Sequence, residues 1–151
     1  LPAAPMTHLY GLFVLEMGPL GGDELNLIER GRNYGWPTVS NGDNYAGPSI
    51  PDHPTKPEFR QPLRSWTPVI SPSGATFYRG SRFPWWRGSA VVGGLSSQSL
   101  IRLMFAGNRI AMEERIYVGR RIRDVLGMRD GSLLAIVDAK NGELIRIAPA
   151  P

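Results

Sequence analysis

The chain has 151 residues, which is enough for one domain, and no stretch of it is as long and apolar as a membrane span. It contains no cysteine, which excludes disulfides, thiolate metal sites and thiol catalysis and leaves the compartment open. The net charge is +4, and nearly all of the positive charge is carried by arginines, which are scattered along the sequence. A nucleic-acid site needs many phosphate contacts on one surface, which scattered arginines do not provide. A small anionic ligand is therefore favoured over a nucleic acid.

Glycine and proline are frequent and distributed along the whole chain. The 18 Gly and 14 Pro favour many short strands and turns over long helices, so the sequence predicts an all-β fold. The first predicted element is a buried strand from Tyr10 to Leu15, a run rich in β-forming residues.

The next segment, residues 18–37, reads GPLGGDELNLIERGRNYGWP and combines tight turns with oxygen ligands. Its Gly-Pro and Gly-Gly pairs turn the backbone sharply and direct carbonyls outward. Asp23 and Glu24 follow, and then a short half-buried strand that ends at the turn after Gly31. Carbonyls and carboxylates without Cys or clustered His suit Ca²⁺. The alternative is that Asp23 and Glu24 only face solvent at a hairpin and bind no ion.

The same segment contains GGDEL at residues 21–25, which is similar to the signature of diguanylate cyclases. Those domains have a long α/β segment with amphipathic helices before the signature, whereas only 20 residues precede it here. We therefore set this similarity aside.

Residues 38–64 carry five prolines and a cluster of Asn, Gly and Asp, so they predict a long irregular loop. His53 lies inside this loop between two prolines, and we expect it to be exposed to solvent. The paired Trp85 and Trp86 follow Phe83-Pro84 and are expected to cap a turn and bury their rings.

The sequence after Trp66 predicts successive short strands at residues 75–80, 89–95, 99–105 and 108–118, and a further set at 121–127, 132–138 and 142–148. Asp130-Gly131 and Asn141-Gly142 are typical of hairpin turns. The spacing between the two sets, about 45 residues, is typical of a β-propeller blade.

Arg121 and Arg123 differ from the other arginines, because residues two apart on a strand project from the same face. They can bind one anion together. The alternative is a solvated strand edge with Asp124 nearby.

Three motifs resemble, in order, the soluble pyrroloquinoline quinone (PQQ)-dependent aldose and glucose/sorbosone dehydrogenases: residues 18–37, SPSGATFYRG at 71–80, and RIRDVLGMRDGSLLAIVDAKNGELIRIAP at 121–149. The resemblance covers the chain from about Leu12 to Pro149 and corresponds to the C-terminal part of the family. It implies a six-bladed β-propeller of the periplasm, of which 151 residues form about two and a half blades. The expected divisions are the end of one blade with the calcium-ligand loop (9–37), a long loop (38–65), a blade (66–118) and the last blade (119–151).

The resemblance also implies a role for particular residues. The carbonyls of Gly18 and Pro19 stand where the family holds the Ca²⁺ that polarises the quinone, and Glu24 and Tyr34 stand where it holds a second, structural Ca²⁺. Two further residues, Arg121 and Arg123, stand where it binds PQQ. Because PQQ is a tricarboxylate, paired guanidinium groups suit it.

Two positions depart from the family. Ser96 stands where its members carry a lysine that contacts PQQ, and Met17 stands where histidine is common. Neither His8 nor His53 matches the motif of the catalytic base, which belongs to the N-terminal half of the family. For the chain alone no catalytic residue is assigned.

Two hypotheses follow. The chain is either the C-terminal piece of a PQQ- and Ca²⁺-dependent sugar dehydrogenase, or a non-catalytic, calcium-stabilised propeller module or truncated remnant with a binding role. In both cases the expected partners are N-terminal blades or a second copy of the chain, because a partial propeller leaves apolar faces and strand edges uncovered. A sugar is the expected substrate of the first.

Overall fold

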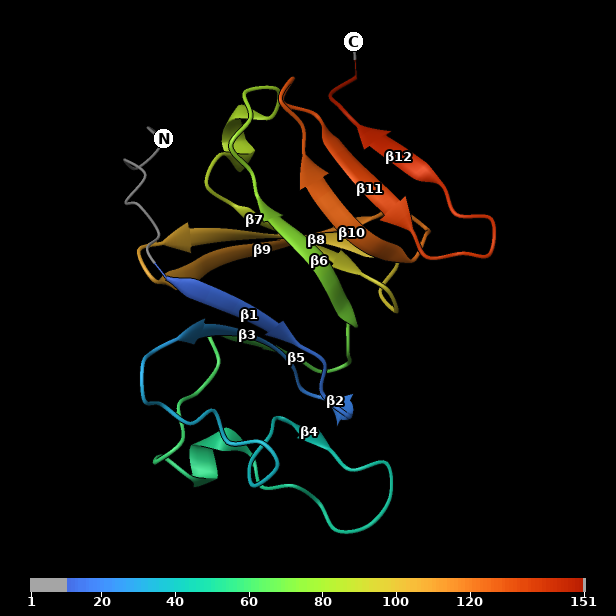
Figure 1. Cartoon of the computed structure of the whole chain (residues 1–151). Coiled ribbons are helices and arrows are strands. Elements are labelled where there is room, and N and C mark those ends of the chain that lie inside the picture. Colours follow the sequence, from blue (N-terminus) through green and yellow to red (C-terminus); the bar gives the residue numbers. More distant parts are fainter. Residues whose placement is uncertain (1–10, 151) are drawn as a thin grey trace. The chain divides into compact units, whose positions relative to one another are not determined.

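The computed structural model describes residues 11–150, and the regular structure in this range is β-strand except for two short 3-10 helices (Figure 1). The all-β prediction is therefore confirmed. The chain forms two compact units, one made of Gly11–Pro72 and one that continues from Ser73. His8 and the predicted start of the first strand at Tyr10 lie outside the described residues.

The first unit is built on an antiparallel sheet of three strands in the order β1-β3-β5. These strands span Leu12–Glu16, Asp23–Ile28 and Arg64–Trp66, and a two-stranded sheet joins β2 (Leu20–Gly21) to β4 (Gly42–Asp43). The prediction for β1 was partly wrong, because Leu12 at its start is 63% exposed. The prediction for β3 was also wrong: as the central strand it is buried from Asp23 to Asn26 on both faces.

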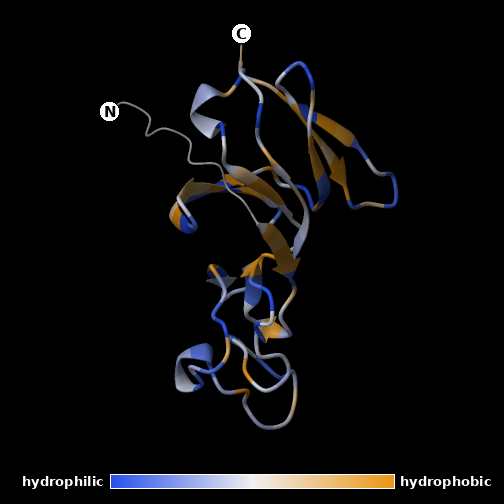
Figure 2. Cartoon of the chain, turned by 60° about the vertical axis from the view of Figure 1, so that its left-hand side comes forward, coloured by the Kyte–Doolittle hydropathy of each residue, from blue (hydrophilic) through white to orange (hydrophobic). Residues whose placement is uncertain are grey.

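The loop between β3 and β5 is long and irregular, as predicted, and it is mostly hydrophilic or neutral (Figure 2). It contains the strand β4 and a 3-10 helix, η1 (His53–Thr55). The backbone N–H of Ser40 donates to the carbonyl of Pro51 at 3.1 Å, so distant parts of the loop are bonded to each other.

The second unit contains a four-stranded antiparallel sheet in the order β6-β7-β8-β9 and a three-stranded sheet in the order β10-β11-β12 (Figure 1). The strand bounds agree with the sequence prediction within about two residues except for β6, which was predicted at residues 75–80 and begins and ends three residues earlier. The predicted turn at Asp130-Gly131 lies between β10 and β11. The strands are Pro72–Phe77, Ala90–Gly94, Ser99–Ala106 and Arg109–Tyr117 in the first sheet, and Ile122–Gly127, Leu133–Val137 and Leu144–Ile147 in the second.

The core of the second unit lies between its two sheets, where β7 and β10 contact each other. Each large apolar side chain in it contributes about 1.5–3 kcal/mol by leaving water. The cluster consists of Tyr78, Val91, Leu100, Ile122, Val125, Leu133 and Ala135.

The paired tryptophans of the second unit have different environments, although the sequence predicted that both would be buried. They lie in the 3-10 helix η2 (Pro84–Trp86). Trp86 stacks on Phe83 with ring centroids 4.7 Å apart and packs against the core, whereas Trp85 is 81% exposed. The prediction was wrong for Trp85, because a single helical turn cannot direct two adjacent side chains to the same side.

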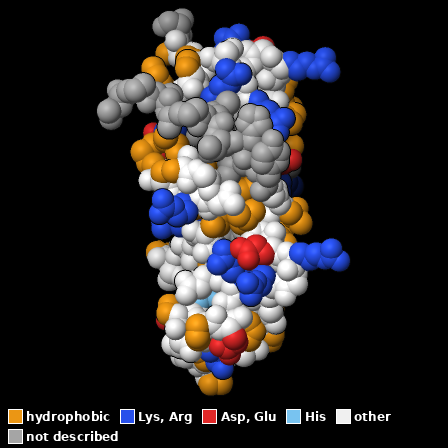
Figure 3. Space-filling view, turned by 90° about the vertical axis from the view of Figure 1, so that its left-hand side faces the viewer, with side chains coloured by type: hydrophobic (Ala, Val, Ile, Leu, Met, Phe, Trp, Pro, Cys, Tyr) orange, Lys and Arg blue, Asp and Glu red, His pale blue; other side chains and the backbone are white. Residues whose placement is uncertain are grey.

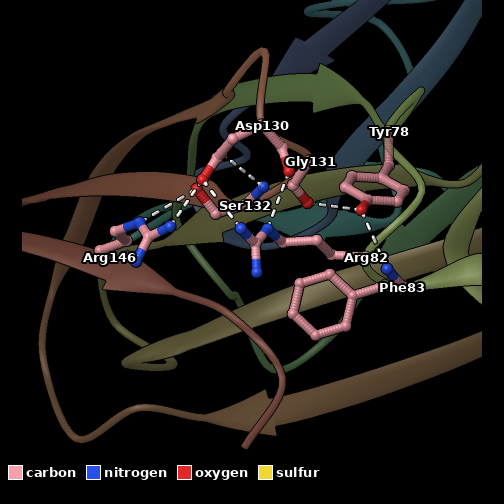
Figure 4. Close-up of polar contacts among 7 residues, drawn as sticks. All are labelled: Tyr78, Arg82, Phe83, Asp130, Gly131, Ser132 and Arg146. Atoms are coloured by element: carbon pink, nitrogen blue, oxygen red, sulfur yellow. Dashed lines mark hydrogen bonds and ion pairs between the residues drawn. The ribbon is translucent and has the colours of Figure 1, made fainter. Parts of the chain in front are cut away.

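The β10–β11 turn is held by a polar network centred on Asp130 (Figure 4). Arg146 Nη2 donates to Asp130 Oδ2 at 2.6 Å, and the Ser132 hydroxyl donates to Oδ1 at 2.6 Å. The Tyr78 hydroxyl donates to the carbonyl of Gly131 at 2.6 Å. The turn is thereby tied both to β12 and to the segment that follows β6.

We expect Gly74→Ala to destabilise the chain. A Cβ at Gly74 would lie 2.7 Å from the Cα of Asp124, so β6 or β10 would have to move. Such overpacking costs about 1–3 kcal/mol, and each kcal/mol lowers the Tm of a chain of this size by about 2–4 °C. Thermal melting monitored by circular dichroism measures the effect. Gly127→Ala is the control, because a Cβ there meets only Thr76 Oγ1 at 3.8 Å; equal Tm losses for both variants would contradict this packing.

We expect the Asp130 network to make stability depend on acidity. Hydrogen bonds from the Ser132 hydroxyl and backbone N–H, and then from Arg146, hold the pKa of Asp130 well below its ordinary value. Because the folded pKa lies below the unfolded one of about 3.9, the stabilisation is present above about pH 4 and disappears as the pH falls further. The Tm difference between wild type and Asp130→Asn should therefore shrink from pH 6 to pH 2. Asp52→Asn in the first unit is the control, and a difference that is constant with pH would refute the prediction.

Candidate functional site

The first unit contains an open pocket of about 360 Å³. It lies where β1 ends and β3 begins, and the turn after β3 completes its wall. Its lining residues are Glu16, Met17, Gly18, Gly22, Glu24, Asn33, Tyr34, Gly35, Trp36, Val39 and Ser40.

Two carboxylates line this pocket from neighbouring strands. The register of β1 and β3 places Glu16 directly opposite Glu24. Glu24 is only 6% exposed, whereas Glu16 is exposed to solvent. Glu16 was not among the predicted site residues, although its place two residues before Gly18, next to the end of a predicted strand, was a usable signal.

The carboxylate of Glu24 has two polar neighbours. Asn26 Nδ2 donates to its Oε2 at 3.2 Å, and His53 Nε2 lies 3.2 Å from its Oε1. Burial is the largest influence on the pKa of Glu24 and raises it above the ordinary value; Asn26 and His53 oppose this shift, and the nearby charge of Glu16 adds to it. Glu24 is therefore a buried acid whose charged form the surrounding protein only partly stabilises.

His53 is 1% exposed, so the prediction of a solvent-exposed histidine was wrong. Bonds within the loop, such as that from Thr55 N to Asp52 O, form the short helix η1 and turn the ring toward β3. Within residues 11–150 neither ring nitrogen of His53 makes a hydrogen bond, and neither does Oδ1 of the fully buried Asn26. Unbonded buried polar atoms are costly, and several of them lie around the Glu24 carboxylate.

Asp23 has a different environment, because adjacent strand residues face opposite sides. It is 1% exposed, and its carboxylate accepts hydrogen bonds from three backbone N–H groups: Gly18 at 2.9 Å, Ile70 at 2.7 Å and Ser71 at 2.7 Å. Asp23 thus fixes the turn before β3 to the link between β5 and β6. Since both Asp23 and Glu24 are buried, the alternative that they only solvate a hairpin is wrong.

The Tyr34 hydroxyl makes its hydrogen bonds with the backbone of nearby residues. It donates to the carbonyl of Leu27 and accepts from the backbone N–H of Glu29 at 2.9 Å. These bonds hold the turn after β3 against the strand, so the body of Tyr34 forms one wall of the pocket.

The structure brings together three of the four predicted metal ligands, because Gly18, Glu24 and Tyr34 all line the pocket. Pro19 is not among the lining residues. Within residues 11–150, no three His, Asp or Glu side chains are grouped as a metal cage.

The predicted cofactor residues Arg121 and Arg123 lie in the second unit at the start of β10, and both bind one carboxylate. Arg121 Nε and Nη2 donate to Asp138 Oδ2 at 3.0 and 2.7 Å, and Arg123 Nη2 lies 3.2 Å from Oδ1. A register shift between Ile122 and Asp124 accompanies this arrangement. Both guanidinium groups lower the pKa of Asp138, Arg121 the more strongly. The acidic neighbour of the pair is therefore Asp138 rather than Asp124.

Basic side chains stand at several separate places on the face that Figure 3 shows, without one continuous patch among the described residues drawn there. No helix within residues 11–150 is long and apolar enough to cross a membrane.

We expect Asp23→Asn to destabilise the first unit strongly. The amide nitrogen would replace an oxygen that accepts backbone N–H groups, and each charge-assisted bond is worth about 1.5–3 kcal/mol, so the loss should be about 3 kcal/mol. Chemical denaturation measures it. The matched control is Asp43→Asn, because Asp43 also accepts two backbone N–H groups, from Asn44 and Ile50, but does so near the surface. Equal losses of stability in the two variants would contradict this role of Asp23.

Comparison with known proteins agrees with this fold. The family model described as Glucose / Sorbosone dehydrogenase matches residues 5–146. An uncharacterized protein of Synechocystis sp. is 41% identical over 138 residues, which are 90% of this chain and 34% of that protein. The aldose sugar dehydrogenase YliI of Escherichia coli is 37% identical over 144 residues, 91% of this chain and 38% of that protein.

Solved structures give the same result. A crystal structure of a glucose dehydrogenase matches with a TM-score of 0.85 at 39% identity and covers 97% of this chain and 43% of its own. The apo-form of the soluble aldose sugar dehydrogenase of Escherichia coli matches with a TM-score of 0.81 at 34% identity, over 93% of this chain and 42% of its own. A PQQ-bound aldose sugar dehydrogenase of Streptomyces coelicolor matches with a TM-score of 0.64 at 26% identity, over 90% and 39%.

These matches confirm the predicted partial propeller, and the chain spans well under half the length of each of these relatives. The match to the family model covers residues from both units. The chain belongs to the glucose/sorbosone dehydrogenase family.

Proposed function

We propose that this chain acts as the C-terminal part of a periplasmic, PQQ- and Ca²⁺-dependent sugar dehydrogenase, in which it supplies a cation pocket and part of the PQQ-binding site. The observation that carries the proposal is the convergence of Arg121 and Arg123 on the single carboxylate of Asp138. The family membership and the PQQ-bound relative support the choice of cofactor.

The arginine pair fits a cofactor that carries several carboxylates. Both side chains are about half exposed, at 49% and 51%, so an incoming anion can reach them. Asp138 keeps the two guanidinium groups close together before a ligand arrives, which reduces the ordering cost of binding. A carboxylate of PQQ would share these donors with Asp138 or take its place.

The pocket in the first unit fits a hard cation. Its candidate donors for the structural ion are the carboxylate of Glu24 and the backbone carbonyl of Tyr34, and oxygen donors are what Ca²⁺ prefers. A cation there would neutralise a carboxylate that is now buried with incomplete partners. We assign Glu24 and Tyr34 in this pocket to the structural Ca²⁺, and the carbonyls of Gly18 and Pro19 to the ion beside the quinone.

When bound, PQQ supplies the acceptor for the hydride of the sugar. The residues of this chain bind and orient the cofactor, and the proton of the sugar hydroxyl must go to a base. His53 is buried against Glu24 and is placed for a structural task. The base histidine therefore belongs to the portion of the longer relatives that this chain does not span.

A non-catalytic, calcium-stabilised module remains the second candidate, and Ser96 is the observation in its favour. Ser96 lies in the turn between β7 and β8, where the family resemblance implies a lysine that contacts PQQ. Loss of that positive charge would weaken the hold on a tricarboxylate by about 1.5–3 kcal/mol.

The test is a fluorescence titration of PQQ against the purified chain. We expect Arg121→Ala/Arg123→Ala to weaken binding by roughly one to two orders of magnitude, because each charge-assisted contact is worth about 1.5–3 kcal/mol. Arg120→Ala is the control, since Arg120 is a neighbouring exposed arginine that pairs with Glu143 instead. Unchanged PQQ affinity in the double variant would refute the PQQ part of the proposal. If the wild-type chain binds PQQ but does not reduce a dye when an aldose is added, the result would agree with a catalytic base outside this chain.

A further inference from the structure

Glu16 and Glu24 form an unusual pair for the wall of a pocket. The β1–β3 register places them directly opposite each other, so their side chains project from the same face of the sheet. Directly opposed like charges destabilise a sheet by about 0.2–1 kcal/mol relative to neutral pairs. A positive charge between the two carboxylates would relieve this repulsion.

The charged side chains that line the pocket are acidic. Among the described residues that line the pocket there is no Lys or Arg, and the two glutamates are its only acidic residues. The remaining walls are backbone, aromatic rings and small polar side chains. The pocket is thus lined by two acidic side chains and by no Lys or Arg, and the buried His53, whose Nε2 lies 3.2 Å from Glu24 Oε1, is a basic group in contact with the pair.

The buried side of the pair gives a second, independent indication of a ligand. His53 and Asn26 are fully buried, both contact the carboxylate of Glu24, and both keep polar atoms without a hydrogen bond among the described residues. Buried polar atoms of this kind usually have a partner in the functional state of a protein. They also restrict the orientation of Glu24 from behind, while Glu16 stays accessible to solvent.

We propose that Glu16 is the second carboxylate ligand of a divalent-cation site in this pocket, opposite Glu24. This inference rests on the cation-binding part of the proposed function and extends it. Two carboxylates balance a divalent cation in full and a monovalent one only in part, so the pair selects Ca²⁺ over Na⁺ or K⁺. The exposed Glu16 forms the entrance, and the buried Glu24 forms the floor.

Isothermal titration calorimetry of CaCl₂ into the purified chain tests the inference. We expect Glu16→Gln to weaken Ca²⁺ binding on the order of tenfold or more, Glu24→Gln to weaken it further, and Glu16→Asp to restore most of the loss. Glu58→Gln removes the same charge from an exposed position of the same unit outside the pocket, and it should bind like wild type.

Thermal melting separates a ligand from a merely structural residue. In EDTA, Glu16→Gln should melt at or above the wild-type temperature, because it removes a like charge opposite Glu24; in millimolar Ca²⁺ it should melt below wild type. A lower Tm in both conditions would mean a structural role and overturn the inference.

The outcomes also distinguish the inference from the proposed function. If wild type binds no Ca²⁺, the calcium part of the proposed function fails together with this inference. If wild type binds and Glu24→Gln does not, but Glu16→Gln binds like wild type, the calcium site stands and the role of Glu16 is refuted. Equal losses in Glu16→Gln and Glu58→Gln would show only a general effect of charge and would also refute it.

Discussion

The first unit depends on the buried carboxylate of Asp23, which accepts three backbone N–H groups from two separate segments of the chain. Donors from Gly18 on one side and from Ile70 and Ser71 on the other would be unsatisfied without it, and each buried unsatisfied donor costs about 1–3 kcal/mol. One side chain thereby fixes the turn that opens the pocket and the link that leads to β6.

The neighbouring Glu24 has the opposite role, because alternation along a strand directs adjacent side chains to opposite faces. Asp23 is satisfied by backbone donors, whereas Glu24 has only Asn26 and His53 beside it and faces Glu16 across the pocket. The strand therefore places one carboxylate that holds the fold next to one that lines the pocket. The fold holds the first rigid so that the second can keep a fixed position.

In the second unit, acidic side chains are paired with arginines instead. Asp130 and Asp138 each bind two arginines, of which Arg123 and Arg146 lie in strands and Arg82 and Arg121 in the segments that connect strands. At Asp130 the pairing secures a turn against its neighbours (Figure 4). At Asp138 it holds Arg121 and Arg123 together while leaving them accessible, as a binding site for an anion requires.

The sequence alone determined the all-β class, the strands of the second unit, the family, and the turns and carboxylates of the segment around Glu24. These features follow from alternation, turn residues and motif spacing, which are local properties of a sequence. Only the tertiary structure decided which polar residues are buried. Loop residue His53 looked exposed between two prolines, yet contacts with residues far away in sequence bury it beside Glu24. The pairing of Glu16 with Glu24, and of Asp138 with the arginines, likewise depends on strand register and turn closure, which bring distant residues together and which local pattern does not encode.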